Sequence, residues 1–134
     1  MATVKSDSLP IRNEQDIVLA RQAVRKLCQT LAFSLVDQTK MVTATSELAR
    51  NAVVYGQGGT LECEVIDDGT RQGLRLHFVD QGPGIPNLDL ALTDGWTSGS
   101  GLGLGLSGAR RLVNEFDIDS APGKGTRVSV TRWK

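Results

Sequence analysis

Apolar residues recur at helical spacing in two segments of the first half of the chain. Over residues 13–31 they fall three, four and seven positions apart, which places them on one stripe of a helix. Asn13 is suited to cap this helix, and Glu14 and Asp16 put negative charge in its first turn. The same periodicity predicts a second helix over residues 37–54, followed by a glycine-rich stop.

After the second helix the period of the pattern changes from helix to strand. The runs 60–66 and 74–79 are rich in β-formers and flank a polar segment with an Asp-Gly pair, so they predict an antiparallel hairpin. Residues 107–115 favour a helix, and a Pro-Gly-Lys-Gly turn separates two further strands at 116–120 and 126–133. The order of these elements predicts an α/β domain.

The 134 residues contain no repeat and no linker-like stretch, so residues 1–134 are predicted to form a single domain. Residues 1–10 are expected to be a flexible lead-in, although 9–13 could also form an edge strand, where Pro10 is tolerated. A free edge strand would offer a surface for a homodimer. The segment 80–106 is rich in Gly, Pro and Ser, with a short helical turn around 87–92. A loop of this length in so small a domain is usually functional or disordered.

The composition narrows the classes of function. Fifteen Lys and Arg balance fifteen Asp and Glu, which argues against nucleic-acid binding but allows a small anionic ligand held by backbone N–H groups. No stretch is apolar enough to cross a membrane, and the first residues lack the apolar core of a signal peptide. Cys28 and Cys63 match neither a metal motif nor a disulfide framework. We therefore expect a cytoplasmic protein in which both thiols are reduced.

Glu47 and Asn51 lie one turn apart on the same face of the second predicted helix. A carboxylate in this position can accept a proton from a nucleophile, and the carboxamide oxygen can bind a hard cation such as Mg²⁺. A solvated helix face can contain the same two residues, so the pair alone does not decide between these interpretations.

Two glycine-containing segments could bind a nucleotide. In Asp80-Gln-Gly-Pro-Gly84, the carboxylate can accept a hydrogen bond from an exocyclic amine, and the glycines let backbone approach a flat ring. A tight turn would use the same residues. In the segment 99–106, alternating glycines and the helix that follows offer backbone N–H groups to a polyphosphate, unless the loop is purely structural. Its spacing matches neither the P-loop nor the dinucleotide-binding fingerprint.

Other residues carry weaker signals. Thr126 at the start of the last strand indicates only β-propensity when it is taken alone. His77 lies in the middle of a strand with no Ser or Cys arranged for nucleophilic catalysis, so we expect an ordinary strand residue. Trp96 is a candidate partner contact in the loop, and Trp133 is expected to close the core.

Taken in order, four segments resemble the Bergerat-fold ATPases, the group that contains gyrase, Hsp90, histidine kinases and MutL. The matching boxes are Glu47-Leu-Ala-Arg-Asn51, Asp80-Gln-Gly-Pro-Gly84, Gly101-Leu-Gly-Leu-Gly105-Leu and Gly125-Thr126. One box alone is a weak signal, whereas four in this order are specific. The resemblance implies a two-layer α/β sandwich in which helices cover one face of a mixed β-sheet.

Within this group the chain most resembles the RsbT-type anti-sigma regulatory serine/threonine kinases, over residues 12–133. A chain made of this domain alone, with His77 as its one histidine, argues against gyrase, Hsp90, MutL and histidine kinases. The segments that carry the closer resemblance are Asp16-Ile-Val-Leu-Ala-Arg-Gln, Ser46-Glu-Leu-Ala-Arg-Asn, Asp94-Gly95 and Arg111-Leu-Val-Asn-Glu-Phe.

The resemblance implies a role for each matching residue. Glu47 would be the general base for a substrate hydroxyl, and Asn51 would bind the Mg²⁺ that bridges the phosphates of ATP. Asp80 would bind the adenine amine, with Thr126 assisting through a water. Arg50 and Arg110 are the nearest basic residues to the lid, over residues 97–106. Backbone groups would complete the site. Gly82 and Gly84 would lie beside the adenine ring. The lid over the phosphates would contain Gly101, Leu102, Gly103, Leu104, Gly105 and Leu106.

The resemblance also implies partners. The substrates would be serine or threonine hydroxyls on STAS-domain proteins of a stressosome-type complex, and the released kinase would activate a PP2C-type phosphatase or another output protein. Two alternatives stay open: an anti-sigma factor kinase that binds a sigma factor directly, and a nucleotide-gated binding module without kinase activity. Glu47 argues against the last of these, because a module that only binds needs no base at that position.

Overall fold

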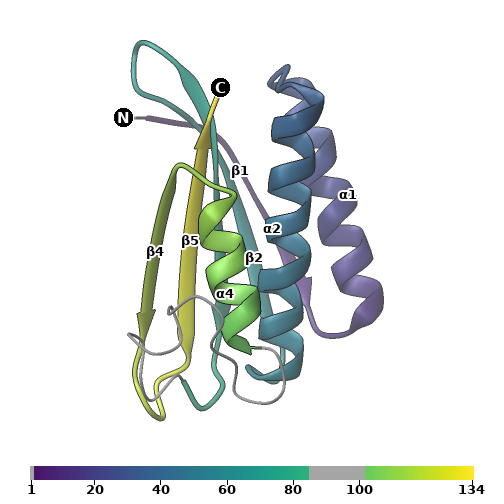
Figure 1. Cartoon of the computed structure of the whole chain (residues 1–134), viewed down its shortest axis with the longest axis vertical. Coiled ribbons are helices and arrows are strands. Elements are labelled where there is room, and N and C mark those ends of the chain that lie inside the picture. The colour runs from purple at the N-terminus through teal and green to yellow at the C-terminus, as the bar shows by residue number, and fades with distance from the viewer. Residues whose placement is uncertain (1, 85–101) are drawn as a thin grey trace.

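The computed structural model describes residues 2–84 and 102–134, which form an antiparallel five-stranded sheet with helices on one face (Figure 1). The strands are ordered β1-β2-β3-β5-β4 across the sheet. The elements in chain order are β1 (Ala2–Ile11), α1 (Glu14–Thr30), α2 (Leu35–Val54), β2 (Gly59–Asp67), β3 (Gln72–Asp80), α4 (Leu102–Arg111), β4 (Glu115–Ser120) and β5 (Thr126–Trp133).

The expectation of a mixed sheet is wrong for the described strands, since each of their pairings is antiparallel. Strand β4 does run in the same direction as β3, because both are antiparallel to β5. The β4–β5 hairpin, however, inserts β5 between them. The two strands of like direction are therefore never neighbours.

Residues 2–11, most of which were expected to be a flexible lead-in, form the edge strand β1. Its pairing with β2 runs from Ala2 opposite Asp67 to Ile11 opposite Gly59, with one irregularity between Thr3 and Lys5. Pro10 lies in this strand, and an edge strand tolerates proline because one side of its backbone has no neighbour. Such a long strand belongs to the fold because the backbone groups on its β2 side are hydrogen-bonded, although few of its side chains are buried.

The starts of the first two helices follow local capping chemistry. The side chain of Asn13 accepts a hydrogen bond from the backbone N–H of Asp16 at 3.0 Å, which confirms the predicted cap of α1. Ser34 caps α2 in the same way, accepting from the N–H of Asp37 at 3.1 Å. Helix α2 therefore begins at Leu35, two residues before the predicted start.

Helix α4 corrects the prediction of a helix over residues 107–115. It spans Leu102–Arg111 and so contains two glycines that were expected to lie in a loop. Glycine weakens a helix by about 1 kcal/mol relative to alanine. Burial of Leu106 and Ala109 against the core offsets that cost, and α4 packs along α2.

The core lies between the helical layer and the sheet. It contains the apolar stripes of α1 and α2 together with one face of each central strand. Cys28 and Cys63 are buried in it as free thiols, and burial raises the pKa of both to about 12. Both cysteines are therefore packing residues, and their free thiols agree with the expectation that neither forms a disulfide.

Asp16 links the end of β1 to α1 and makes stability depend on pH. Its carboxylate accepts hydrogen bonds at 2.9 Å from both the Nε and the backbone N–H of Arg12. These bonds, the side-chain one above all, lower the pKa of Asp16. A carboxyl group whose pKa is lower in the folded chain stabilises the fold above its unfolded pKa, about 3.9, and loses that contribution as pH falls toward the folded value.

We expect Asp16→Asn to lose less melting temperature than the wild type when the pH is lowered from about 7 to about 3. The asparagine cannot be protonated in this range, so its contacts do not change with pH. Thermal unfolding followed by circular dichroism at both pH values measures the difference. Asp117→Asn, an exposed substitution on β4, is the control. An equal acid-induced loss in Asp16→Asn and wild type would contradict the prediction.

Candidate active site

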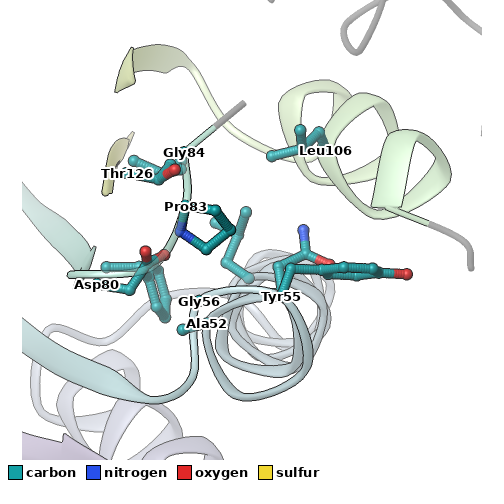
Figure 2. A pocket seen from close by; sticks show the side chains of 12 residues that line it. Ala52, Tyr55, Gly56, Asp80, Pro83, Gly84, Leu106 and Thr126 are labelled. Atoms are coloured by element: carbon teal, nitrogen blue, oxygen red, sulfur yellow. The ribbon is translucent and has the colours of Figure 1, made fainter. Parts of the chain in front are cut away.

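A cavity of about 200 Å³ opens between α2, the start of α4 and the adjoining ends of β3 and β5 (Figure 2). Each of the four sequence motifs contributes to its wall, through Asn51, Asp80, Leu106 and Thr126. The lining is mostly apolar with a few polar groups, which is typical of a small-molecule site. The complete lining is Leu48, Asn51, Ala52, Tyr55, Gly56, Phe78, Asp80, Pro83, Gly84, Leu106, Thr126 and Val128.

The first turns of α4 lie against Glu47 and Asn51. A methyl group placed on Gly105 would be 3.2 Å from both the Oδ1 and the Nδ2 of Asn51, and 3.4 Å from Oε2 of Glu47. Glycine at this position thus allows the helix to approach both side chains. The start of a helix carries backbone N–H groups without helical partners and a partial positive charge, so an anion-binding element adjoins the carboxylate and the carboxamide.

The side-chain amide of Asn51 is incompletely satisfied. Its Nδ2 is buried and has no hydrogen-bond partner in the described part of the chain. A buried polar atom without a partner costs about 1–3 kcal/mol. The Nδ2 can therefore donate to an acceptor on a ligand, and the amide oxygen is of the type that binds Mg²⁺.

Asp80 lies at the end of β3, where it is held by backbone groups from two other segments. Its carboxylate accepts hydrogen bonds from the N–H of Gly82, at 2.9 Å, and from the N–H of Thr126. Burial raises the pKa of Asp80, and these two hydrogen bonds partly offset the effect. A methyl group on Gly56 would lie 2.3 Å from the Asp80 Cγ, so glycine is required where α2 ends. The carboxylate is thus an oriented acceptor in the cavity wall.

The glycines of the second motif allow backbone to pack on backbone. Gly84 has φ of +79°, and a methyl group there would lie 2.0 Å from the carbonyl oxygen of Ala121. On Gly82 the same group would lie 2.6 Å from the Cα of Gly56. Gly125, with φ of +74°, faces the carbonyl oxygen of Asp80 in a comparable way. These contacts bring the segment after β3 against the β4–β5 turn and shape one wall of the cavity.

Some predicted site residues lie outside the cavity or outside the described residues. Arg50 forms an exposed ion pair with Glu14 at 3.0 Å, and Arg110 lies in the last turn of α4, so neither lines the cavity. Several predicted features lie outside the described residues: the turn expected around 87–92, Trp96, the lid residues 97–100 and Gly101. Leu102, Gly103 and Leu104 form the start of α4.

His77 lies within strand β3, as expected, and it has hydrogen-bond partners on neighbouring strands. It is buried on the face of the sheet opposite the helices, with its Nδ1 2.7 Å from the Oγ of Ser129 and its Nε2 paired with the carboxylate of Glu64. Glu64 also accepts from the Oγ1 of Thr3 at 2.9 Å. The serine partner was missed because it lies on a strand 52 residues away in sequence. This row of side chains links β1, β2, β3 and β5.

The described residues contain neither a cluster of metal-binding side chains nor a membrane-spanning helix. No group of three or more His, Cys, Asp and Glu side chains there could hold a metal ion. No helix in that part of the chain is long and apolar enough to cross a membrane.

Sequence comparison relates the chain to a known class of domains. The family model described as histidine kinase-, DNA gyrase B-, and HSP90-like ATPase matches residues 36–134. The serine/threonine-protein kinase RsbT of Bacillus subtilis is 42% identical over 123 residues, covering 92% of this chain and 92% of the relative. An anti-sigma F factor of Clostridium kluyveri is 29% identical over 128 residues, covering 91% of this chain and 89% of the relative.

Solved structures give the same picture of the fold. The RsbU and RsbW domains of a Mycobacterium tuberculosis protein match 98% of this chain with a TM-score of 0.67 and 20% sequence identity, within 33% of that longer chain. The SiaB-SiaC complex of Pseudomonas aeruginosa matches with a TM-score of 0.52 and 11% identity, covering 98% of this chain and 91% of that one. At these identities the likeness concerns the fold alone.

Proposed function

The chain belongs to the histidine kinase-, DNA gyrase B- and HSP90-like ATPase family and is a serine/threonine kinase of the RsbT type, and we propose that it phosphorylates STAS-domain proteins. The observation that carries the proposal is the convergence of all four motifs on one cavity, with the carboxylate of Glu47 beside Asn51 at the start of α4. Neither a purely structural loop nor a solvated helix face requires this convergence.

The two ends of the cavity suit the two ends of ATP. Asp80 is an oriented acceptor for the exocyclic amine of adenine, and the apolar wall that includes Phe78 and Val128 suits the flat ring. The start of α4 suits the phosphates, because its backbone N–H groups and positive dipole end favour anions. We therefore place the adenine beside the end of β3 and the phosphates at the start of α4.

Asn51 is the residue that would hold Mg²⁺. Its buried Nδ2, which has no partner in the described residues, can donate to a phosphate oxygen, and this leaves the amide oxygen for the cation. The cation supplies positive charge to the phosphate oxygens when it is bound. Asn51 lies one turn after Glu47 on α2, so a cation held by Asn51 would be close to the carboxylate of Glu47.

Glu47 is placed to act as the general base. Its carboxylate would take the proton of the substrate hydroxyl as the hydroxyl oxygen bonds to the γ-phosphorus and the bond from that phosphorus to ADP breaks. Transfer of this kind depends mainly on positioning and charge stabilisation, so few catalytic side chains suffice. The positioning comes from α2, which is packed against both α1 and α4.

We propose STAS-domain proteins of a stressosome-type complex as substrates, and a PP2C-type phosphatase or similar output protein as the partner after release. The 42% identity to RsbT supports a kinase of this kind, and we propose that it works in the cytoplasm. A second candidate is an anti-sigma factor kinase that binds a sigma factor directly. The relatives named anti-sigma F factor, at 22–29% identity, favour testing it.

The first experiment combines the purified chain, Mg²⁺, γ-radiolabelled ATP and a panel of STAS-domain proteins from the same genome. We expect label on a serine or threonine of at least one STAS protein. Capture of a sigma factor by the immobilised, ATP-loaded chain would favour the second candidate. Measurable ATP binding with no transfer to any STAS protein would contradict the proposed STAS substrates and favour a nucleotide-gated binding module.

A further inference from the structure

Ser120 connects the cavity residue Thr126 to a backbone carbonyl. Its Oγ lies 2.9 Å from the carbonyl oxygen of Gly125 and 2.8 Å from the Oγ1 of Thr126. Both hydroxyls are half-buried, and the two residues are cross-strand partners on β4 and β5. Ser120 itself does not line the cavity, so it acts on a ligand only through Thr126.

The direction of these hydrogen bonds follows from counting protons. A carbonyl oxygen only accepts, so the one proton of the Ser120 hydroxyl goes to Gly125. The contact between the two hydroxyls then needs the proton of Thr126, which must point toward Ser120. The Thr126 oxygen is left with lone pairs alone for the cavity.

The carbonyl that sets this direction is itself held in place. Gly125 has φ of +74°, and any side chain there would collide with the carbonyl oxygen of Asp80, 2.2 Å from the position of a methyl group. Close packing against Asp80 and the neighbouring turn fixes the peptide, and with it the acceptor that Ser120 must satisfy. The fixed Gly125 carbonyl therefore favours this orientation of the two hydroxyls.

We propose that Ser120 is a specificity-determining positioning residue, which holds the Thr126 hydroxyl so that the base end of the cavity accepts hydrogen bonds and selects a 6-amino purine over a 6-keto purine. The proposal rests on ATP being the nucleotide bound. Asp80 and Thr126 both offer acceptors in this wall. An adenine amine donates directly to such a wall, whereas the carbonyl of a 6-keto purine in direct contact faces acceptors with no proton between them.

Removal of Ser120 would release the Thr126 proton. In Ser120→Ala the Thr126 hydroxyl can rotate and donate into the cavity, so the wall would tolerate a 6-keto group. ATP and inosine triphosphate (ITP) are suitable probes, because they differ only at the edge of the base that meets this wall. We expect wild type to prefer ATP, and Ser120→Ala to lower the ratio of the two dissociation constants by roughly tenfold, the size of one neutral hydrogen bond.

Matched variants separate this role from a structural one, with both dissociation constants measured by isothermal titration calorimetry. Ser120→Thr keeps the hydroxyl and should keep the ATP preference. Thr126→Val should lower the preference, and adding Ser120→Ala to it should have no further effect. Ser120→Cys, close to serine in size but a poor acceptor, should behave as Ser120→Ala if the alanine variant does not fold. A general loss of stability would weaken the binding of both nucleotides and leave the ratio of their dissociation constants unchanged.

Two results overturn the inference alone: equal affinity of the wild type for ATP and ITP, or an unchanged ratio in folded Ser120→Ala or Ser120→Cys while Thr126→Val lowers it. A wild-type chain that binds neither nucleotide would instead overturn the proposed function, and the inference with it. A lowered ratio in Ser120→Ala that Ser120→Thr restores would establish the role.

Discussion

Glu47→Gln is expected to lower the rate of phosphoryl transfer by a factor of about 10² to 10⁴, the usual contribution of a general base. Glutamine has nearly the same shape but cannot take the proton of the substrate hydroxyl. ATP binding should be unchanged, because Glu47 does not line the cavity in which we place the adenine ring. Single-turnover transfer from radiolabelled ATP to a STAS-domain protein measures the rate, and calorimetry measures nucleotide affinity.

The matched control for this variant is Glu62→Gln. Glu62 is also partly buried, but it belongs to β2 and lies opposite His77 in the pairing with β3, away from the cavity. Its replacement removes the same charge and should leave the transfer rate unchanged. A Glu47→Gln variant that transfers phosphate at the wild-type rate would show that another group, or none, takes the proton.

Asp80→Asn is expected to weaken ATP binding by about 10- to 150-fold, the effect of removing a hydrogen bond to a charged acceptor. Asparagine has one acceptor oxygen where aspartate has two. Two backbone N–H groups, from Gly82 and Thr126, already compete for the acceptors of this side chain. The amide nitrogen would then face the adenine amine, donor against donor.

Calorimetric titration with ATP and with adenosine separates this effect from one on the phosphates. Asp80→Asn should bind both ligands more weakly than the wild type, because both carry the adenine amine. Asp117→Asn, which removes an exposed carboxylate on β4, should bind both as the wild type does. Unchanged adenosine binding by folded Asp80→Asn would show that Asp80 does not bind the adenine amine.

Local signals were enough to locate the candidate residues of the site. Side-chain capping by Asn13 and apolar periodicity act within a few residues, so the sequence alone predicted α1 and most of α2. The spacing of Glu47 and Asn51 likewise follows from helix geometry. Strands β2 and β3 were recognisable because a polar Asp-Gly segment separates two runs of β-formers.

What only the tertiary structure decided involves contacts between distant segments. Strand β1 forms because β2 supplies its hydrogen bonds, and α4 extends into a glycine-rich segment because the core buries Leu106. The collision of any side chain at Gly56 with Asp80 was not visible in the sequence, and neither was the link from Ser120 to Thr126. Sequence patterns report the preferences of a segment for its own conformation. Hydrogen-bond direction and backbone proximity across strands depend on register and packing, which are set only when the whole sheet has formed.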